Sequence, residues 1–271
     1  MRRHYLPAAL FAVISASTLI SSQAGEDSMP LPVAAETKSS SAFSGSLSFD
    51  MNTHFISYGA DTWGAGNNFD DALFNPSLGL AWDLGNDFSL TLGTWWDVND
   101  NAISDIGSNV QEVDVWAGIS YGGGPVEISL TYQQWYYAEE TEQILDLAFG
   151  FDLPLNPSLT LHGRLSEGAS GGDNGVVPVL GFELPGFSLG AAEFSFPVSV
   201  AFATDAFHGG DAGFAFASAG AGVSIPLPIM EVMGEWALNA GVTYYYTDDM
   251  VIPNNPDESF FTGNIGIGLS F

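Results

Sequence analysis

Large apolar side chains and small or polar ones alternate with a period of two along most of the chain after residue 43. Successive side chains of a β-strand point to opposite faces, so this alternation predicts strands, and no helical periodicity accompanies it. The alternating runs lie at residues 43–57, 75–84, 87–98, 111–121, 125–137, 142–153, 158–165, 176–184, 192–203, 214–225, 235–247 and 259–271. The sequence therefore predicts an all-β fold of about 12 strands.

The connections between these runs alternate between long acidic loops and tight turns. The loop at residues 59–74 is followed by the turn at 85–86, and the loop at 99–109 by the glycine turn at 122–124. One exception is the segment 138–141, which is short although a long loop is expected at its place in the alternation. Such alternation is typical of an up-and-down antiparallel barrel with loops at one end and turns at the other. Closure requires the last run, 259–271, to pair with the first.

The two faces of each strand indicate which solvent surrounds the barrel. In the run 75–84, the residues Leu78, Leu80 and Trp82 share one face, while small residues share the other. A barrel in water would then expose a face of Gly, Ala, Ser and Thr with few charges, whereas a bilayer accepts the large residues outside. Aromatic residues at the strand ends predict two girdles, formed by Trp96, Tyr136, Tyr244 and Tyr246 near the loops and by Trp82, Phe88, Tyr121 and Phe271 near the turns. We therefore expect a transmembrane β-barrel in the outer membrane.

The N-terminal region is predicted to direct export. Arg2 and Arg3 precede an apolar stretch at 6–20, and a small-x-small pattern ends at Ala24, so residues 1–24 resemble a secretory signal peptide. Residues 25–42 are rich in Ser, Pro, Glu and Ala and predict a flexible periplasmic lead. The barrel is assigned to residues 43–271.

Composition excludes several classes of function. The chain has 32 Asp and Glu against 4 Lys and Arg, a formal net charge of −28, so repulsion excludes nucleic acid as a partner. It has no cysteine, which removes disulfides and thiol catalysis. We expect no cofactor.

Side chains predicted to face the lumen are strongly acidic. A wall of carboxylates favours cations and repels anions, although the same acids can simply bond to lumenal Ser and Thr hydroxyls. The predicted inward acids are Asp50, Asp83, Asp97, Glu112, Asp114, Glu127, Asp146, Asp152 and Glu183.

Other inward candidates are basic or aromatic. Arg164 is the one cation of the predicted wall, and pairing across the turn at 154–157 sets it opposite Asp146; we expect it to contact this or another inward acid. His162 lies on the same face, as a hydrogen-bond partner or a pH sensor. Trp95, Trp116 and Trp135 come from three consecutive strands, where their rings either stack on solutes or fill the lumen.

The loops carry further acids but no clear metal site. Oxygen-rich loops bind divalent cations diffusely. The run DVNDN at 97–101 matches the opening of a calcium loop, but it lacks the later Gly and Glu, so a defined metal site is not predicted. The loop acids are Asp61, Asp70, Asp71, Asp100, Asp105, Glu139, Glu140, Glu142, Asp248, Asp249, Asp257 and Glu258.

A catalytic site finds little support. GFSLG at 186–190 matches G-x-S-x-G, but a nucleophile elbow needs a following helix and none is predicted. A membrane lipid hydrolase would require His54 or His162 beside a Ser and a third orienting group. His208 is the remaining histidine after the signal peptide.

Three blocks of sequence carry a family resemblance: LTLGTWWDVND, QEVDVWAGISYG and VEISLTYQQWYY. They resemble the TorF-like family of outer-membrane porins, through a G-x-W strand end at Gly93, an acidic strand at Glu112 and a Tyr-rich strand at Thr131. The likeness covers about a fifth of the chain, and the central strands and extreme acidity depart from it. It implies a small channel with no catalytic residues.

The sequence as a whole predicts a narrow, cation-leaning diffusion channel for small solutes. The alternatives are a non-conducting barrel whose acidic loops bind surface lipid, cations or a partner, a lipid hydrolase, and a soluble β-sandwich adhesin. The terminal Phe271 resembles the assembly signal of outer-membrane barrels, which implies recognition by the insertion machinery, and the outer face predicts contact with membrane lipid.

Overall fold

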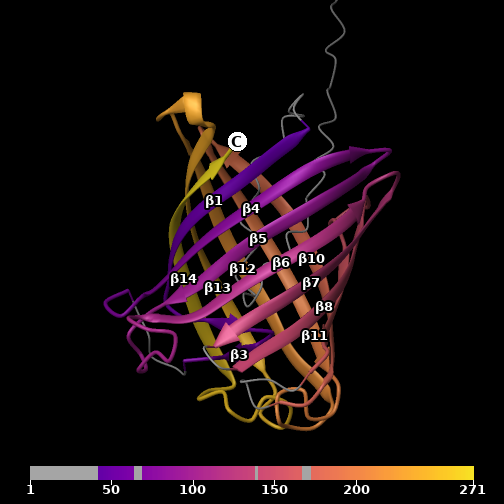
Figure 1. The fold of residues 1–271 in the computed structure, drawn as a ribbon, viewed down its shortest axis with the longest axis vertical. Coiled ribbons are helices and arrows are strands. Elements are labelled where there is room, and N and C mark those ends of the chain that lie inside the picture. Colours follow the sequence, from indigo (N-terminus) through magenta and orange to yellow (C-terminus); the bar gives the residue numbers. More distant parts are fainter. Residues whose placement is uncertain (1–41, 64–68, 138–139, 167–171) are drawn as a thin grey trace, which may run out of the picture.

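The computed structural model describes residues 42–63, 69–137, 140–166 and 172–271, so the predicted signal peptide and nearly all of the predicted lead lie outside the described residues. Twelve antiparallel strands form a closed barrel in which chain neighbours are also spatial neighbours (Figure 1). The predicted fold class is therefore confirmed. The barrel strands are β1 (Phe43–Asn52), β4 (Leu73–Gly85), β5 (Phe88–Val98), β6 (Val110–Tyr121), β7 (Val126–Tyr137), β8 (Glu140–Phe151), β9 (Ser158–Arg164), β10 (Gly175–Leu189), β11 (Ala192–Ala203), β12 (Gly213–Leu227), β13 (Glu235–Thr247) and β14 (Ser259–Ser270).

The seam between the first and last strands closes the barrel. β1 pairs with β14 in a continuous register from Ser46 opposite Ser270 to Asn52 opposite Asn264. Beyond the last strand, Gly45 and Phe271 exchange two backbone hydrogen bonds of 2.8 and 2.9 Å. The Phe271 ring lies over Gly45, where an added Cβ would be 2.5 Å from the ring. The pairing on which the predicted architecture depends is confirmed.

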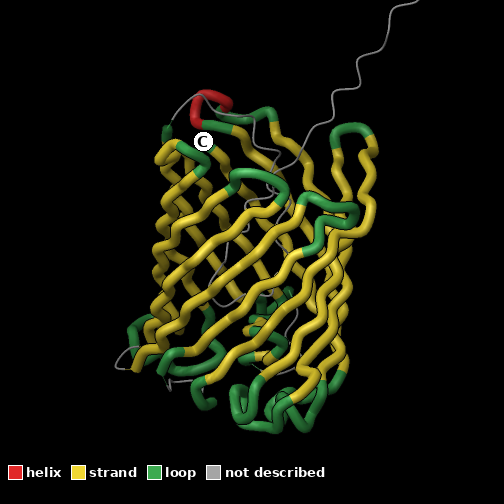
Figure 2. Tube along the Cα trace, turned by 90° about the vertical axis from the view of Figure 1, so that its right-hand side faces the viewer, coloured by secondary structure: helices red, strands yellow, loops and turns green. Residues whose placement is uncertain are grey.

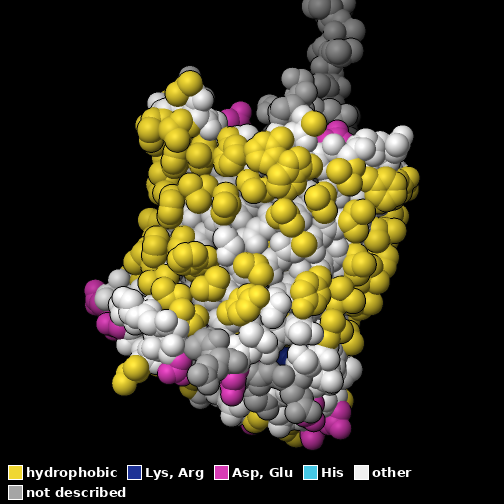
Figure 3. Space-filling view, in the orientation of Figure 1, with side chains coloured by type: hydrophobic (Ala, Val, Ile, Leu, Met, Phe, Trp, Pro, Cys, Tyr) yellow, Lys and Arg dark blue, Asp and Glu magenta, His cyan; other side chains and the backbone are white. Residues whose placement is uncertain are grey.

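The outer wall is apolar, as a barrel in a bilayer requires. Phe49, Leu92, Ile119 and Val242 point outward and are exposed, while the residues beside them in each strand face inward. Figure 3 shows hydrophobic side chains across the wall, with Asp and Glu near its ends. The aromatic residues predicted for the loop-side girdle, Trp96, Tyr136, Tyr244 and Tyr246, are all exposed there.

The two ends of the barrel differ in their connections (Figure 2). Short turns join the strands at the end that holds the C-terminus, including a 3₁₀ turn, η1 (Glu231–Met233). Longer loops crowd the opposite end, here called the loop end. Among the described residues, no helix is both long and apolar enough to cross a membrane.

The first strand was predicted at 43–57, and its predicted end is wrong, because β1 ends at Asn52. The chain leaves the wall after Asn52, where Thr53 N–H donates to the Gly263 carbonyl (2.9 Å) and Gly263 N–H donates to the Thr53 hydroxyl (2.8 Å). It then forms a small hairpin of β2 (Ile56–Ser57) and β3 (Ala60–Asp61) inside the barrel. Tyr58 and Gly59, with φ of 49° and 87°, make the two-residue turn that such a tight hairpin requires.

This hairpin and two loops fill the loop end of the lumen. We call residues 53–63, 204–212 and 248–258 the plug. Its apolar side chains pack against inward residues of the wall to form a hydrophobic core inside the barrel. That core consists of Ile56, Phe207, Val251 and Ile252 from the plug and Val177, Ala201, Ala203, Ala215, Phe216 and Tyr245 from the wall.

Candidate functional site: the acidic lumen behind the plug

Most of the predicted inward acids lie buried inside the barrel. Asp50, Asp97, Glu112, Asp114 and Asp146 are each at most 8% exposed. Because they alternate with lipid-facing residues along their strands, the same parity that places Leu and Ile outside places these carboxylates inside. They line the loop half of the lumen.

The remaining predicted acids lie at the turn half. Asp83 is exposed and accepts a hydrogen bond from Gly85 N–H (2.7 Å) within its turn. Glu127 is half-buried, and Glu183 accepts from Phe196 N–H (2.9 Å). Asp152 is exposed and lies beyond the end of β8, so its prediction as a strand residue is wrong.

The Asp97 carboxylate has a full set of donors. Trp63 Nε1 donates to it at 2.7 Å, Asn99 Nδ2 at 2.9 Å and Asn75 Nδ2 at 3.1 Å. Three N–H donors satisfy a buried carboxylate without a metal or an arginine. One of them, Trp63, belongs to the plug, so this acid also ties the plug to β5.

Among the residues that the structure describes, Glu112 and Asp114, unlike Asp97, lack hydrogen-bond donors for most of their carboxylate oxygens. Neither oxygen of Asp114, nor Oε1 of Glu112, has a hydrogen-bond donor in the described part of the chain. The two carboxyl groups are polar neighbours of each other, and the Tyr137 hydroxyl is a further neighbour of Glu112. In the strand register, Asp114 lies directly opposite Trp95 on one side and Trp135 on the other.

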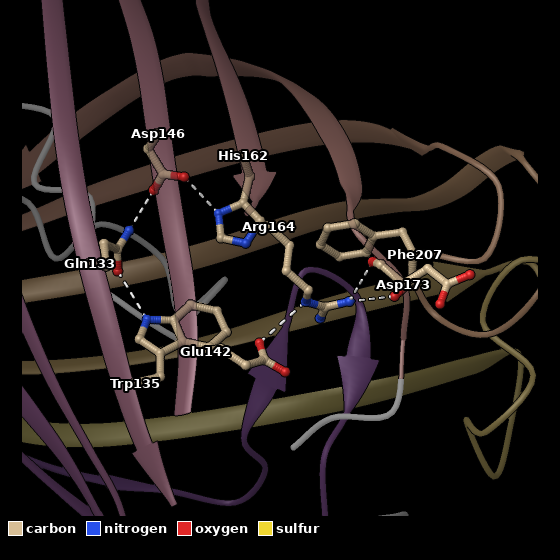
Figure 4. Close-up of polar contacts among 8 residues, drawn as sticks. All are labelled: Gln133, Trp135, Glu142, Asp146, His162, Arg164, Asp173 and Phe207. Carbon is tan, nitrogen blue, oxygen red and sulfur yellow. Dashed lines mark hydrogen bonds and ion pairs between the residues drawn. The ribbon is translucent and has the colours of Figure 1, made fainter. Parts of the chain in front are cut away.

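Arg164 points into the barrel, as predicted from its strand face, but its partner is Glu142 and not Asp146. Arg164 Nε lies 3.3 Å from Glu142 Oε2 (Figure 4). Nη1 donates to the carbonyl oxygens of Phe207 (2.7 Å) and Asp173 (3.3 Å), and the guanidinium lies 4.1 Å from the centre of the Phe207 ring. Arg164 therefore holds the plug loop 204–212 against β8 and β9.

The register between β8 and β9 explains why Arg164 contacts Glu142, another inward acid, and not Asp146. Ile144 pairs with Arg164 and Asp146 pairs with His162, two residues away from the predicted alignment. β8 ends at Phe151, and Leu155 and Asn156 adopt positive φ in a wider turn than expected. Glu142, predicted as a loop acid, is thus a fully buried strand residue. Asp61, also predicted as a loop acid, is buried in the plug.

His162 is part of a buried polar chain that Figure 4 shows on β7, β8 and β9. Its Nδ1 lies 2.7 Å from Asp146 Oδ1, and Gln133 Nε2 donates to Asp146 Oδ2 at 2.5 Å. Trp135 Nε1 then donates to Gln133 Oε1 at 3.2 Å. Sequence reasoning missed Gln133, although its position two residues before Trp135 places it on the same inward face.

Aromatic rings cover this wall from the plug side. The ring centres of Phe55 and Trp95 are 5.0 Å apart, and Tyr58 stacks on His162 with 3.4 Å between the ring centres. Trp95 and Trp135 are almost fully buried, and Trp116 is half-buried between their two clusters. Trp116 crosses Gly93 on the neighbouring strand, where an added Cβ would overlap the indole.

No serine–histidine pair of a hydrolase is present among the described residues. His54 Nδ1 lies 2.9 Å from the Thr53 hydroxyl, whose oxygen already accepts the Gly263 N–H. His54 Nε2 is 3.9 Å from Asp61, too long for an orienting hydrogen bond. The G-x-S-x-G run lies at the end of β10 and in the turn to β11, so a strand follows it instead of a helix.

Burial changes the acidity of three plug residues. It raises the pKa of Asp61 to about 7, and the backbone N–H of Trp63 offsets part of this rise. It lowers the pKa of His54. The pKa of His208 falls to about 3, because of burial and of the nearby Arg164 and His162. Within the described ranges, no three His, Cys, Asp or Glu side chains are arranged to hold a metal.

Comparisons with known proteins give only distant likenesses. No family model matches the chain, and no curated protein matches it. Among solved structures, the chain is similar to "KdgM porin" with 10% identity and a TM-score of 0.45, covering 83% of this chain and 99% of that one. It is similar to the NanC porin with 10% identity and a TM-score of 0.41, covering 84% and 99%. The translocator domain of autotransporter NalP from Neisseria meningitidis shares 14% identity and a TM-score of 0.42, covering 87% and 90%. At such identities and TM-scores these likenesses carry no conclusion, and the fold rests on the strand pairing itself.

Proposed function

We propose that the protein is an outer-membrane channel for small solutes, leaning toward cations, and that its plug closes the loop end in the state described. The observation that carries this proposal is the set of buried carboxylates on β5–β8 against the single wall cation Arg164. A wall with that charge balance attracts cations and repels anions. The resemblance to the TorF-like family supports the same class of function.

The surroundings of the barrel support the outer membrane. Closed barrels and helices are the structures that satisfy every backbone hydrogen bond in lipid, and the wall is closed at the β1–β14 seam. The exposed apolar band and its aromatic girdles fit contact with membrane lipid. We further propose that the insertion machinery recognises the last strand with its terminal Phe271.

The plug is the element that must move for transport. Asn255 fastens its hairpin: Asn255 Nδ2 donates to the Gly59 carbonyl (2.8 Å), and Asp61 N–H donates to Asn255 Oδ1 (2.8 Å). Side-chain hydrogen bonds of this kind contribute about 0.5–1.5 kcal/mol each, so a few of them can hold a closed state that still opens.

A non-conducting barrel is the second candidate, and one observation favours it. The plug core is packed without exposed surface, since Phe207, Phe216 and Ile252 are each at most 1% exposed. In that case the lumen serves only to anchor the acidic loops, which would bind surface lipid, divalent cations or a partner. A lipid hydrolase is disfavoured by the surroundings of His54 and His162.

Reversal potentials across a planar bilayer in a KCl gradient separate these candidates. The Asn255→Ala variant removes hydrogen bonds that hold the plug hairpin. We expect this variant to conduct, and the sign of its reversal potential should show that cations permeate better than chloride. Adding Glu112→Gln and Asp114→Asn should lower the cation-to-anion permeability ratio by at least about twofold. Asp249→Asn, which changes an exposed loop acid, is the matched control. Absence of conductance, or preference for chloride, would defeat the channel.

A further inference from the structure

We propose that Trp95, Asp114 and Trp135, with Glu112 beside them, form a binding subsite for an organic cation of the quaternary ammonium kind, and that the plug covers this subsite with its own aromatic rings. The inference rests on the proposed channel, because the site faces the lumen and is reached only when the plug moves. It names the class of solute that this wall recognises.

In the described ranges, Asp114 and Glu112 present buried hydrogen-bond acceptors without donors. Asp114 is fully buried, yet neither of its oxygens receives an N–H or O–H donor within the residues described, and Glu112 Oε1 is in the same condition. Leaving a buried carboxylate without donors is costly, and two carboxylates can share nothing but a proton. A proton shared between Glu112 and Asp114 satisfies only two of the three oxygens, so the partner of the remaining one is a cation or a hydrogen-bond donor.

Two tryptophans flank the Asp114 carboxylate. Trp95 and Trp135 lie directly opposite Asp114 on the strands to either side, so the carboxylate is flanked by two indoles. Indole faces attract cations, with about 0.5–2 kcal/mol for each favourable contact. A carboxylate between two indoles suits a cation that carries apolar groups. The carboxylate attracts its charge, and the indole rings contact both its charge and its apolar groups.

Aromatic rings of the plug pack against the same wall. Phe55 packs against Trp95, and Tyr58 packs against the Trp135 and Ile144 cluster while it stacks on His162. These rings pack against the two indoles of the subsite, so we expect the plug and the solute to compete. A ligand that binds only the open state shifts the population toward it, and the cation is expected to open its own channel.

The charges around the site exclude other ligand classes. Arg164 is the one described arginine near it, and its guanidinium is already engaged by Glu142 and the Phe207 carbonyl. An anion would meet three unpaired carboxylate oxygens. A divalent metal would need three suitably placed ligands, and the described residues offer no such group. The indole N–H of Trp95 also has no acceptor in the described part of the chain, so it is a donor for a hydroxyl group on the cation.

Equilibrium dialysis of the full-length Asn255→Ala protein tests the site without measuring transport. The probe is choline chloride, compared with potassium chloride and with 3,3-dimethylbutan-1-ol, the uncharged isostere of choline. We expect saturable choline binding that the isostere and potassium do not compete for. Trp135→Phe should weaken it severalfold and Asp114→Asn by about tenfold or more.

Matched controls keep the outcomes distinct. Trp82→Phe changes a tryptophan of the opposite, lipid-facing strand face and should leave choline binding unchanged. Equal competition by potassium would reassign the site to inorganic cations, and equal binding of the isostere would show a merely apolar site; either result overturns the inference. A channel that conducts cations without binding choline refutes this inference alone. A barrel that binds choline without conducting refutes the proposed function alone.

Discussion

The size of a side chain that fits at an inward position of this barrel depends on the residue paired with it on the neighbouring strand. The Trp116 indole crosses Gly93 of β5, with which it is paired, so the lumen accommodates a large ring only because that position lacks a side chain. The sequence pattern placed Gly93 on the inward face, but it could not show that the adjacent strand supplies the ring.

Substituting Gly93 tests this packing. An added Cβ would overlap the Trp116 indole and lie 2.7 Å from the Leu78 carbonyl oxygen, and backbone cannot yield as a flexible side chain does. We expect Gly93→Ala to lower the free energy of unfolding by about 1–3 kcal/mol, measured by urea unfolding in lipid vesicles. Gly268→Ala is the control, since its nearest atom would be 3.4 Å away. Equal effects would show that the Trp116 contact is not tight.

The Arg164–Glu142 pair provides a second test at this scale. Removing Arg164 leaves the fully buried Glu142 without its cation, and breaking such a pair costs about 3–5 kcal/mol. We expect Arg164→Leu to destabilise the folded protein by about that amount, and the double variant with Glu142→Gln to recover part of the loss. Additive effects in this double-mutant cycle, measured by urea unfolding, would mean that the two side chains are not coupled.

At the scale of elements, the strands were largely predictable and the plug was not. Period-two alternation is long and regular in the twelve barrel strands, and observed ends differ from predicted ones by a few residues. The hairpin of β2 and β3 consists of two-residue strands, too short to leave a period, so it was absorbed into the first strand and the following loop. Its Tyr58-Gly59 turn was the one local signal available.

The pH dependence of the plug follows from Asp61, which lies in β3 and does not span the membrane. Its usual pKa of 3.8 rises to about 7 in the docked plug, so the docked state binds the proton more tightly. This stabilisation is complete below the usual pKa and is lost as the pH rises through about 7. His54 acts in the opposite sense, because its lowered pKa gives stabilisation that is lost as the pH falls.

Comparing wild type with Asp61→Asn isolates the Asp61 contribution, since both proteins keep His54 and His208. The ratio of open probabilities, wild type over Asp61→Asn, should rise between about pH 4 and pH 8 in single-channel recordings. A ratio that stays flat over this range would show that Asp61 does not titrate with plug movement.

The closing seam carries a prediction about Phe271. Its ring lies over Gly45 and 6.3 Å from the Phe43 ring, and the same residue is proposed as the assembly signal. Phe271→Ala should cost about 1 kcal/mol of stability in refolded protein and should also lower the yield of assembled barrel in cells. Gly45→Ala displaces the ring but keeps the terminal Phe, so it should affect stability alone. An equal loss of cellular assembly in both variants would remove the role in recognition.

At the scale of the whole molecule, alternation and connection lengths were enough to predict a closed antiparallel barrel with an acidic interior. They could not predict whether the lumen is open, because that depends on how residues 53–63, 204–212 and 248–258 pack against one another across long sequence separations. Arg164 contacts an inward acid as predicted, but the identity of that acid, Glu142, was not predictable for a similar reason, since one turn shifted the register by two residues.

The plug also changes how the lumen acids are understood. Among the described residues, Asp97 holds the plug through Trp63, whereas the Asp114 oxygens have no hydrogen-bond partner. The proposed channel therefore combines an acidic wall with a movable closure, and both features lie in the loop half of the barrel.

The most direct test of this account is the open probability of single channels in wild type and in Asn255→Ala. Loss of the Asn255 hydrogen bonds to the hairpin should raise the open probability by about tenfold, with the unitary conductance unchanged. Asn254→Ala, at the exposed neighbouring position, should behave as wild type. A wild-type channel that is already open as often as Asn255→Ala, or a variant that never opens, would contradict the account.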